Sequence, residues 1–201
     1  MPAPLDAPLW KDFLAGSERA FERLFLQYYD ELYGYGMRLS RDPDLVKDCI
    51  QNLFQRLWQR RATLGAVAVV RPYLFRALRN QVADELAARQ RRSLLHADQP
   101  VEFEVQYSPE DFLIAQQLTA AQHAQLLAAL SQLNNRQREA IHLRFFEGFG
   151  YDRISEIMAL NPQSARNLIY QGLKRLREAL PLLLLGLGLG SRLPGAAGLG
   201  G

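Results

Sequence analysis

The sequence predicts an all-α protein: two small helical domains joined by a flexible acidic linker, the second domain containing a helix-turn-helix. Apolar residues recur with a period near 3.6 along most of the chain, and no segment shows sustained strand alternation with hairpin turns. Residues 93–109 have no clear period and contain two prolines. We therefore divide the chain into a domain at 1–92, a linker at 93–109, a domain at 110–180 and a Leu/Gly-rich tail at 181–201, which we expect to be disordered.

Charge is distributed unevenly along the chain, although its net value is only +3. Residues 71–92 hold six arginines and two acids, and residues 163–180 hold four basic residues and one acid. The stretch 93–135 between them holds five acids and no Lys or Arg. Two basic segments separated by an acidic connector indicate two surfaces for a polyanion.

Three helices are predicted in the first domain. Ser17 can cap the first helix, whose apolar stripe runs to Tyr35. Asp42 is the cap of the second helix and Pro43 its first residue, since proline at this position loses no hydrogen bond. The second helix ends near residue 61, a break follows at 62–70, and the third helix covers about 72–92.

Four helical segments are predicted in the second domain. Asn161 can cap the last of them through its side-chain oxygen, and Pro162 fits its first turn. Ala165, Ile169 and Leu176 belong to one apolar stripe on this helix. The segments lie near 110–131, 135–147, 151–159 and 162–180.

The last two segments have the plan of a helix-turn-helix. A short helix, a three-residue turn at 159–161 and a second helix with a polar leading end follow one another. Gln163, Arg166 and Asn167 suit base edges, because Arg forks onto guanine and Gln or Asn can bond adenine twice. On pattern alone, a plain helical hairpin with a solvated cationic face remains nearly as good an interpretation.

An aromatic pair stands out on the second helix. Phe54 and Trp58, four residues apart, are accompanied by the polar residues Asp48 and Gln51. Large aromatic area beside polar groups is typical of a protein–protein hot spot. Burial of both rings in the domain core is the alternative, and the pattern by itself favours it.

The third helix combines aromatic residues with a basic track. Tyr73 lies near its start, and arginines decorate its length. Unpaired bases stack on aromatic rings while their backbone meets Arg, so the composition suits single-stranded nucleic acid. An ordinary solvated basic surface is the alternative.

Several functional classes are disfavoured by composition. The single Cys49 cannot form an internal disulfide, and the opening residues lack the pattern of a secretion signal, so we expect a cytoplasmic protein. The apolar run near 181–190 is too short and glycine-rich to span a membrane, and we expect no membrane insertion. His96, His123 and His142 are scattered, without metal spacing or a phosphate loop. We therefore expect no enzyme, no cofactor and no small-molecule substrate.

Taken together, these motifs resemble a known family, the extracytoplasmic-function (ECF) RNA polymerase sigma factors, which are the small members of the sigma-70 family. The resemblance covers about 17–92 and 110–180. Four stretches carry it in family order: AFERLFLQYYDELYGYGMRL, DCIQNLFQRLWQRR, YLFRALRNQVADELAARQRR and LNNRQREAIHLRFFEGFGYDRISEIMALNPQSARNLIYQGLKRLRE. Asn52 and Ala87 depart from the usual family residues, an acid and a basic residue respectively.

The resemblance implies a role for each surface. The second helix would dock on core polymerase, the third would recognise and melt the −10 promoter element, and the helix-turn-helix would recognise the −35 element. The implied polymerase-binding residues are Asp48, Gln51, Phe54 and Trp58; the −10 residues are Tyr73, Arg76, Arg79, Asn80, Arg89, Arg91 and Arg92; the −35 residues are Gln163, Ser164, Arg166, Asn167, Tyr170 and Lys174.

The implied partners are bacterial core RNA polymerase, promoter DNA and an anti-sigma factor, because ECF members are commonly silenced by one. A helix-turn-helix regulator that is not a polymerase subunit is the nearest alternative. Such a regulator has no need of a clamp-type helix at 44–61. An adaptor that kept the fold and titrates another partner is a third hypothesis.

Overall fold

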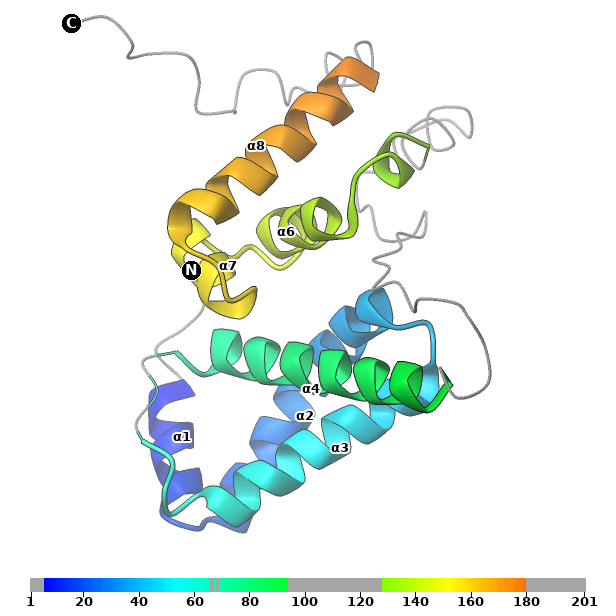
Figure 1. Ribbon diagram of the computed structural model, residues 1–201. Coiled ribbons are helices and arrows are strands. Elements are labelled where there is room, and N and C mark those ends of the chain that lie inside the picture. Colours follow the sequence, from blue (N-terminus) through cyan, green and yellow to red (C-terminus); the bar gives the residue numbers. More distant parts are fainter. Residues whose placement is uncertain (1–5, 66, 68, 94–127, 180–201) are drawn as a thin grey trace, which may run out of the picture.

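A computed structural model of the protein describes residues 6–65, 67, 69–93 and 128–179. All regular structure in this part of the chain is helical (Figure 1). The helices are α1 (Asp6–Leu14), α2 (Glu18–Leu39), α3 (Pro43–Arg60), α4 (Val70–Ser93), α6 (Asn135–Phe145), α7 (Tyr151–Ile157) and α8 (Pro162–Ala179). Residues 128–131 are also helical. The predicted all-α class is confirmed.

Helix boundaries in the first half follow the predicted caps. The Ser17 hydroxyl accepts a hydrogen bond from the Ala20 amide at the start of α2. Asp42 Oδ1 accepts from the amides of Asp44 and Leu45, so that Pro43 begins α3 as predicted. Helix α4 begins two residues before the predicted start, because Val70 is buried and Pro72 is tolerated in a first turn.

Helix α1 is an element that the sequence analysis did not predict. Trp10 and Phe13 are buried, with ring centroids 5.0 Å apart, and they fasten this short helix to the rest of the domain. Trp10 Nε1 also donates to the carbonyl oxygen of Gly65 at 3.4 Å. Helix α1 therefore anchors the segment between α3 and α4.

The second half is built around the predicted helix-turn-helix. A capping box begins α6: Asn134 Oδ1 accepts from the Gln137 amide, and the Gln137 side chain accepts from the Asn134 amide. Asn161 Oδ1 accepts from the Ser164 amide at 2.7 Å, which confirms the predicted cap of α8. The turn between α7 and α8 passes through Ala159 at φ 51°.

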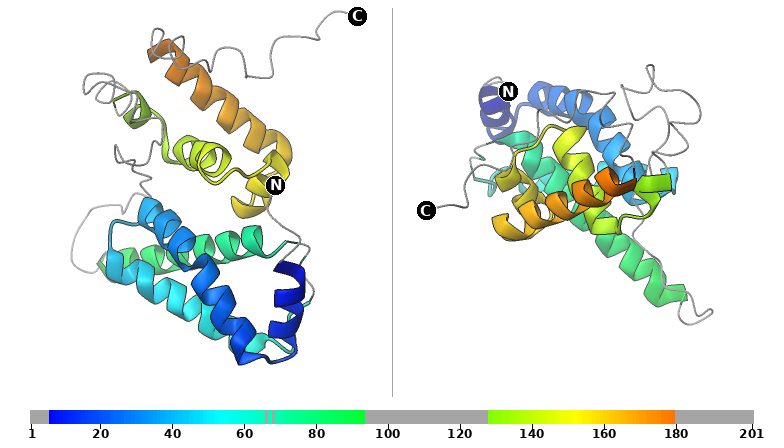
Figure 2. Two further views of the ribbon diagram at one scale, coloured as in Figure 1. Left: turned by 180° about the vertical axis from the view of Figure 1, so that it is seen from behind. Right: turned by 90° about the horizontal axis from the view of Figure 1, so that it is seen from above.

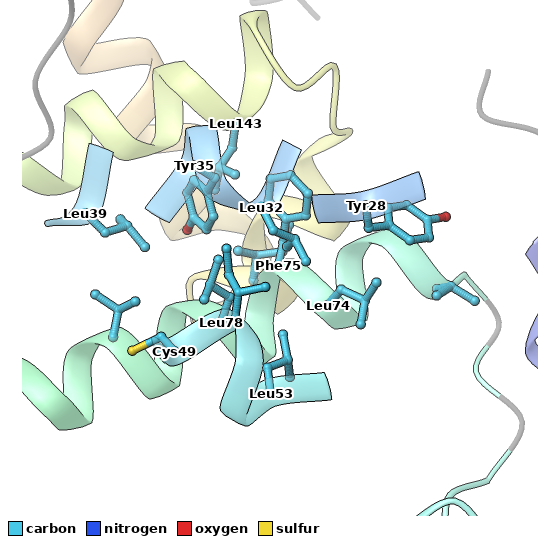
Figure 3. Close-up of a cluster of buried hydrophobic side chains, with 14 of the residues drawn as sticks. Tyr28, Leu32, Tyr35, Leu39, Cys49, Leu53, Leu74, Phe75, Leu78 and Leu143 are labelled. Carbon is cyan, nitrogen blue, oxygen red and sulfur yellow. The ribbon is translucent and has the colours of Figure 1, made fainter. Parts of the chain in front are cut away.

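The two halves pack against each other and share one hydrophobic core. Helix α7 packs on α4, and α6–α8 lie on the opposite side of α4 from α1 and α3 (Figures 1 and 2). Leu143 of α6 lies beside Tyr35 in the buried cluster around Phe75 (Figure 3). Phe149 belongs to the same buried cluster. The Phe75 and Phe149 rings meet edge-on at 5.0 Å.

Some predictions lie outside the described residues. These are the linker at 94–109, the helical segment from 110 to 127 and the tail at 181–201. Among the helices that are described, none is long and apolar enough to cross a bilayer.

Candidate functional site

Helix α8 separates a buried stripe from an exposed polar face. Ala165 and Ile169 are fully buried, as the sequence predicted. The opposite face is open to solvent, including Tyr170 at 69% exposure. Of the six predicted −35 residues, Gln163, Arg166, Asn167, Tyr170 and Lys174 are exposed and Ser164 is half-buried. The structure thus gathers all six on the accessible part of one helix.

Contacts with α6 and α7 fix the orientation of α8. A Cβ at Gly172 would lie 2.7 Å from Ile141 Cδ1, so glycine permits the close approach of α8 to α6. Gln137 bridges the pair, donating to Gln171 at 3.4 Å and accepting from Arg175 at 3.2 Å. Arg166 remains exposed while its guanidinium lies 5.8 Å from the Tyr151 ring centroid. The leading end of α8 is therefore held in place without covering its polar side chains.

A second accessible surface is an aromatic groove between α2 and α3, with a volume of about 660 Å³. Phe54 is only 3% exposed and Trp58 is half-buried. Gln51 is exposed at the edge of the groove, and Asp48 lies exposed one turn earlier on α3. The residues that line the groove are Glu18, Phe21, Phe25, Gln51, Phe54, Gln55 and Trp58. We call this feature the aromatic groove.

The aromatic groove combines core and surface character. Phe54 packs edge-on against Phe25 at 5.0 Å and Phe21 at 6.0 Å, which makes it largely a core residue. Trp58 contacts Phe21 at 5.1 Å and has the Arg61 guanidinium 4.2 Å from its ring centroid. Phe21 and Phe25 were not among the predicted site residues. Their helical spacing alone did not distinguish a groove wall from the core.

Some side chains of the basic track on α4 are exposed to solvent, and others are held in ion pairs. Arg76 and Asn80 are exposed, and Tyr73 is half-buried. Burial raises the pKa of Tyr73 above its usual value, so the ring keeps its hydroxyl proton. Tyr73 packs edge-on against Trp10 with centroids 5.7 Å apart. These residues form an accessible surface next to the segment that joins α3 to α4.

The Arg79 guanidinium on this track is engaged by the second half of the protein. Arg79 Nε lies 2.6 Å from Glu139 Oε1, and Nη2 donates to Oε2 at 3.3 Å. Burial alone would lower the pKa of Arg79, but the hydrogen bond and charge of Glu139 outweigh it and raise the pKa. Tyr35 Oη also donates to Glu139, at 2.7 Å. From its sequence pattern, Arg79 is expected on an accessible surface, and no local signal indicates its pairing with Glu139.

Arginines at the far end of α4 form surface ion pairs. Arg89 contacts Asp42 at 2.5 Å and Glu85 at 3.5 Å, and Arg92 contacts Glu85 at 2.9 Å. The amide of Leu45 and the Arg89 side chain lower the pKa of Asp42, so this carboxylate stays charged. Arg91 is exposed. Exposed pairs of this kind exchange partners at little cost, which leaves these arginines available to phosphates.

Arg71 is an important residue that the sequence analysis did not single out. Its guanidinium contacts Glu31 at 2.6 Å and Glu147 at 2.5 Å, and lies 4.5 Å from the Phe149 ring centroid. Arg71 also donates to the Glu147 carbonyl oxygen at 2.7 Å. These partners come from α2 and from the segment between α6 and α7, so no local sequence signal could have indicated them.

Comparison with protein families assigns one model to each half. The model described as Sigma-70 region 2 matches residues 24–92, and the model described as Sigma-70, region 4 matches residues 123–176. The first match contains α3 and all of α4 except its last residue, and the second contains α6, α7 and most of α8. Helix α1 precedes the first match.

Relatives and solved structures agree with these matches. The ECF RNA polymerase sigma factor BldN of Streptomyces coelicolor is 30% identical over 83% of this chain, and the chain spans 62% of BldN. The RNA polymerase sigma-H factor of Pseudomonas aeruginosa is 27% identical, with 84% of this chain and 90% of that protein covered. Two solved structures share the fold. RpoE of Bartonella quintana, in complex with the anti-sigma factor NepR, matches with a TM-score of 0.58 and 21% identity, covering 81% of this chain and 98% of that chain. CnrH, in complex with the cytosolic domain of CnrY, matches with a TM-score of 0.59 and 18% identity, covering 88% of this chain and 97% of that chain. The chain therefore belongs to the sigma-70 family of RNA polymerase sigma factors, within its ECF group.

Proposed function

We propose that the chain binds bacterial core RNA polymerase through α3 and directs it to promoters by contacting the −10 element with α4 and the −35 element with α8. One observation carries this proposal: a single chain presents both the aromatic groove and the exposed polar face of α8. The groove supports a polymerase contact, because accessible aromatic area with a polar rim, here Glu18, Gln51 and Gln55, is typical of a protein–protein interface. A regulator that only binds DNA has no need of the groove.

The −35 contact is assigned to the leading turns of α8. We assign Gln163 and Arg166, which are exposed, to base edges in the major groove, and Lys174, farther along, to a phosphate. Gln163 Nε2 donates to Asn167 Oδ1 at 3.1 Å, which aligns the two amides on one face. These contacts would fix the register of the polymerase on duplex DNA.

The −10 contact is assigned to α4 and the segment before it. Tyr73 offers a ring on which an unpaired base can stack, and Arg76 and Asn80 are exposed nearby. By binding single strands better than duplex, this surface stabilises the melted promoter, because a ligand shifts an equilibrium toward the state that it binds more tightly. No bond is made or broken by the protein in this mechanism.

Regulation and location follow from the same assignment. In their solved structures RpoE and CnrH are bound to NepR and to the cytosolic domain of CnrY, respectively. An anti-sigma factor is accordingly proposed for this chain as well. Because core polymerase and promoter DNA are the other proposed partners, the protein would act in the cytoplasm.

The test is reconstitution with core polymerase that lacks any sigma factor. We expect co-elution with the full chain and RNA that starts at defined sites on a library of upstream DNA regions. DNA binding without polymerase association would favour the regulator instead. Absence of both activities would contradict the proposal and favour the adaptor.

A further inference from the structure

Helix α1 precedes the Sigma-70 region 2 match, yet it contacts the surface that we assign to the −10 element. It packs on α2 and α4, and Figure 1 shows it running from the end of α3 to the start of α4. Its two buried aromatic residues, Trp10 and Phe13, are 2% and 1% exposed. The contacts of these two rings therefore determine which parts of the domain α1 can influence.

Trp10 contacts two parts of the −10 surface at once. Its ring meets the Tyr73 ring edge-on, with centroids 5.7 Å apart. Its Nε1 donates to the Gly65 carbonyl oxygen at 3.4 Å, and a buried indole normally requires such an acceptor for its N–H. Tyr73 lies in the first turn of α4, and Gly65 lies in the segment that joins α3 to α4. One buried side chain thus links this segment to the ring on which an unpaired base is proposed to stack.

The segment between α3 and α4 depends on tertiary contacts for its conformation. Helix α3 ends at Arg60, and the amides of Thr63 and Leu64 still bond to the Arg60 carbonyl oxygen. Beyond them, none of the described residues 65, 67 and 69 is helical. Because no helical hydrogen-bond ladder fixes these three residues, the contact of Gly65 with Trp10 contributes directly to where the segment lies.

We propose that Trp10 is a positioning residue for the −10 element: it holds the Tyr73 ring and the Gly65 carbonyl in the arrangement that receives an unpaired base. This inference rests on the proposed function of α4. A ring that is already held in place binds a base without the entropy cost of ordering it first. Trp10 itself is buried, so it acts through Tyr73 and the segment before α4 without touching DNA.

Three substitutions separate the roles of the two rings. Trp10→Leu keeps a buried apolar side chain but removes both the ring contact and the N–H donor. Trp10→Phe keeps an aromatic ring against Tyr73. Tyr73→Leu removes the proposed stacking ring itself. Each full chain is bound to sigma-free core polymerase, and its stability is followed separately by urea unfolding.

The probe is the single strand that the parental complex selects from a random 12-nucleotide pool. Its fluorescein-labelled form reports affinity by anisotropy, and repeating the selection with each variant complex reports base preference. Tyr73→Leu should bind the probe roughly tenfold more weakly, because stacking of one base on an aromatic ring contributes about that much. Trp10→Leu should bind it at least about threefold more weakly and lose preference at the same base, whereas Trp10→Phe should stay within about twofold of the parent.

The double variant tests whether Trp10 acts through Tyr73. Adding Trp10→Leu to Tyr73→Leu should weaken binding by less than about twofold further, because a positioning residue has little effect once the ring that it positions is gone. Losses that multiply in full would show that the two side chains act independently and would overturn the proposal. If Trp10→Leu does not fold, Trp10→Met takes its place with the same expected loss, since methionine fills irregular core space.

Val46→Ala is the control for general destabilisation. Val46 is fully buried near the start of α3, roughly 18 Å along the helix from Trp58 and the end that α1 contacts. Val46→Ala should lower the urea midpoint and leave the affinity and base preference for the probe unchanged. An equal loss of affinity in Val46→Ala and Trp10→Leu would reduce the effect to destabilisation and overturn the proposal.

The same comparison distinguishes failure of this inference from failure of the proposed function. Parental affinity in Tyr73→Leu would refute the assignment of Tyr73 to the −10 element. A loss in Tyr73→Leu accompanied by parental affinity and preference in Trp10→Leu would leave that assignment standing and overturn only the positioning role of Trp10.

Discussion

Trp58→Ala is the substitution that separates a polymerase anchor from a core residue. Trp58 is half-buried against Phe21 and lines the aromatic groove. Truncating a fully buried Trp costs about 3–5 kcal/mol of stability, so a half-buried ring should cost about 2 kcal/mol. A hot-spot Trp contributes at least ~2 kcal/mol to binding, which is roughly a 30-fold rise in Kd. Trp58→Ala should therefore remain folded and bind core polymerase at least 30-fold more weakly.

Phe54 behaves differently in the same comparison. At 3% exposure, Phe54→Ala should lose about 3–5 kcal/mol, a large part of a typical folding free energy of about 5–15 kcal/mol. Its effect on polymerase binding is then mixed with unfolding. Phe54→Leu keeps an apolar side chain there and should bind core polymerase with a smaller loss than Trp58→Ala.

The assay combines urea unfolding with a binding titration against sigma-free core polymerase. Leu26→Ala is the control, because Leu26 is 66% exposed on α2 and does not line the groove. It should change neither stability nor Kd appreciably. A folded Trp58→Ala protein that binds polymerase with the parental Kd would refute the assignment of the groove.

Three further predictions concern DNA reading, helix packing and the thiol. Arg166→Ala should weaken binding to the −35 element by ~1–3 kcal/mol and relax the preference at one base pair. Lys174→Ala should weaken binding to all DNA sequences alike and lower the slope of log affinity against log salt concentration by about 1. A binding-site selection at several salt concentrations distinguishes the two outcomes. Gly36→Ala should destabilise the protein by about 1 kcal/mol in urea unfolding, because the added Cβ would lie 2.6 Å from the buried Val46 Cγ1 and overpacking outweighs the better helix propensity. Gly34→Ala, whose Cβ would have nothing within 4 Å, should stabilise the protein by up to about 1 kcal/mol. Burial raises the pKa of Cys49 to about 11, so the folded chain holds the thiol proton more tightly than the unfolded chain. The free energy of unfolding should therefore fall as pH rises from 9 to 11. A thiol reagent at pH 8 should label the native protein far more slowly than the protein in urea.

The helices that local chemistry specifies were predictable from sequence. Ser17, Asp42 and Asn161 carry side chains that cap the following turn, and each does so in the structure. Helix α1 was missed because nine residues with an internal proline have little helix propensity of their own. It forms through the burial of Trp10 and Phe13, which is a tertiary effect.

The candidate site was predictable where one helix supplies it and not where distant segments meet. The face of α8 follows from its 3.6-residue period, and its exposure agrees with that prediction. Glu139 lies 60 residues from Arg79 and 104 from Tyr35, so their pairing has no local signature. For the same reason the sequence indicated a basic track on α4 but not the acid that occupies part of it.

The division of α8 into a structural stripe and a polar face bears on how its sequence preference can change. Ala165 and Ile169 contribute to the core, whereas Gln163, Arg166 and Asn167 stand in solvent. Substitutions on the solvent face of a helix usually alter stability by less than about 0.5 kcal/mol. If α8 reads the −35 element as proposed, promoter choice can drift, or be reprogrammed by design, with almost no effect on folding. On that assignment, duplicated genes for such a protein can acquire separate target sets by changing a few side chains on one helix.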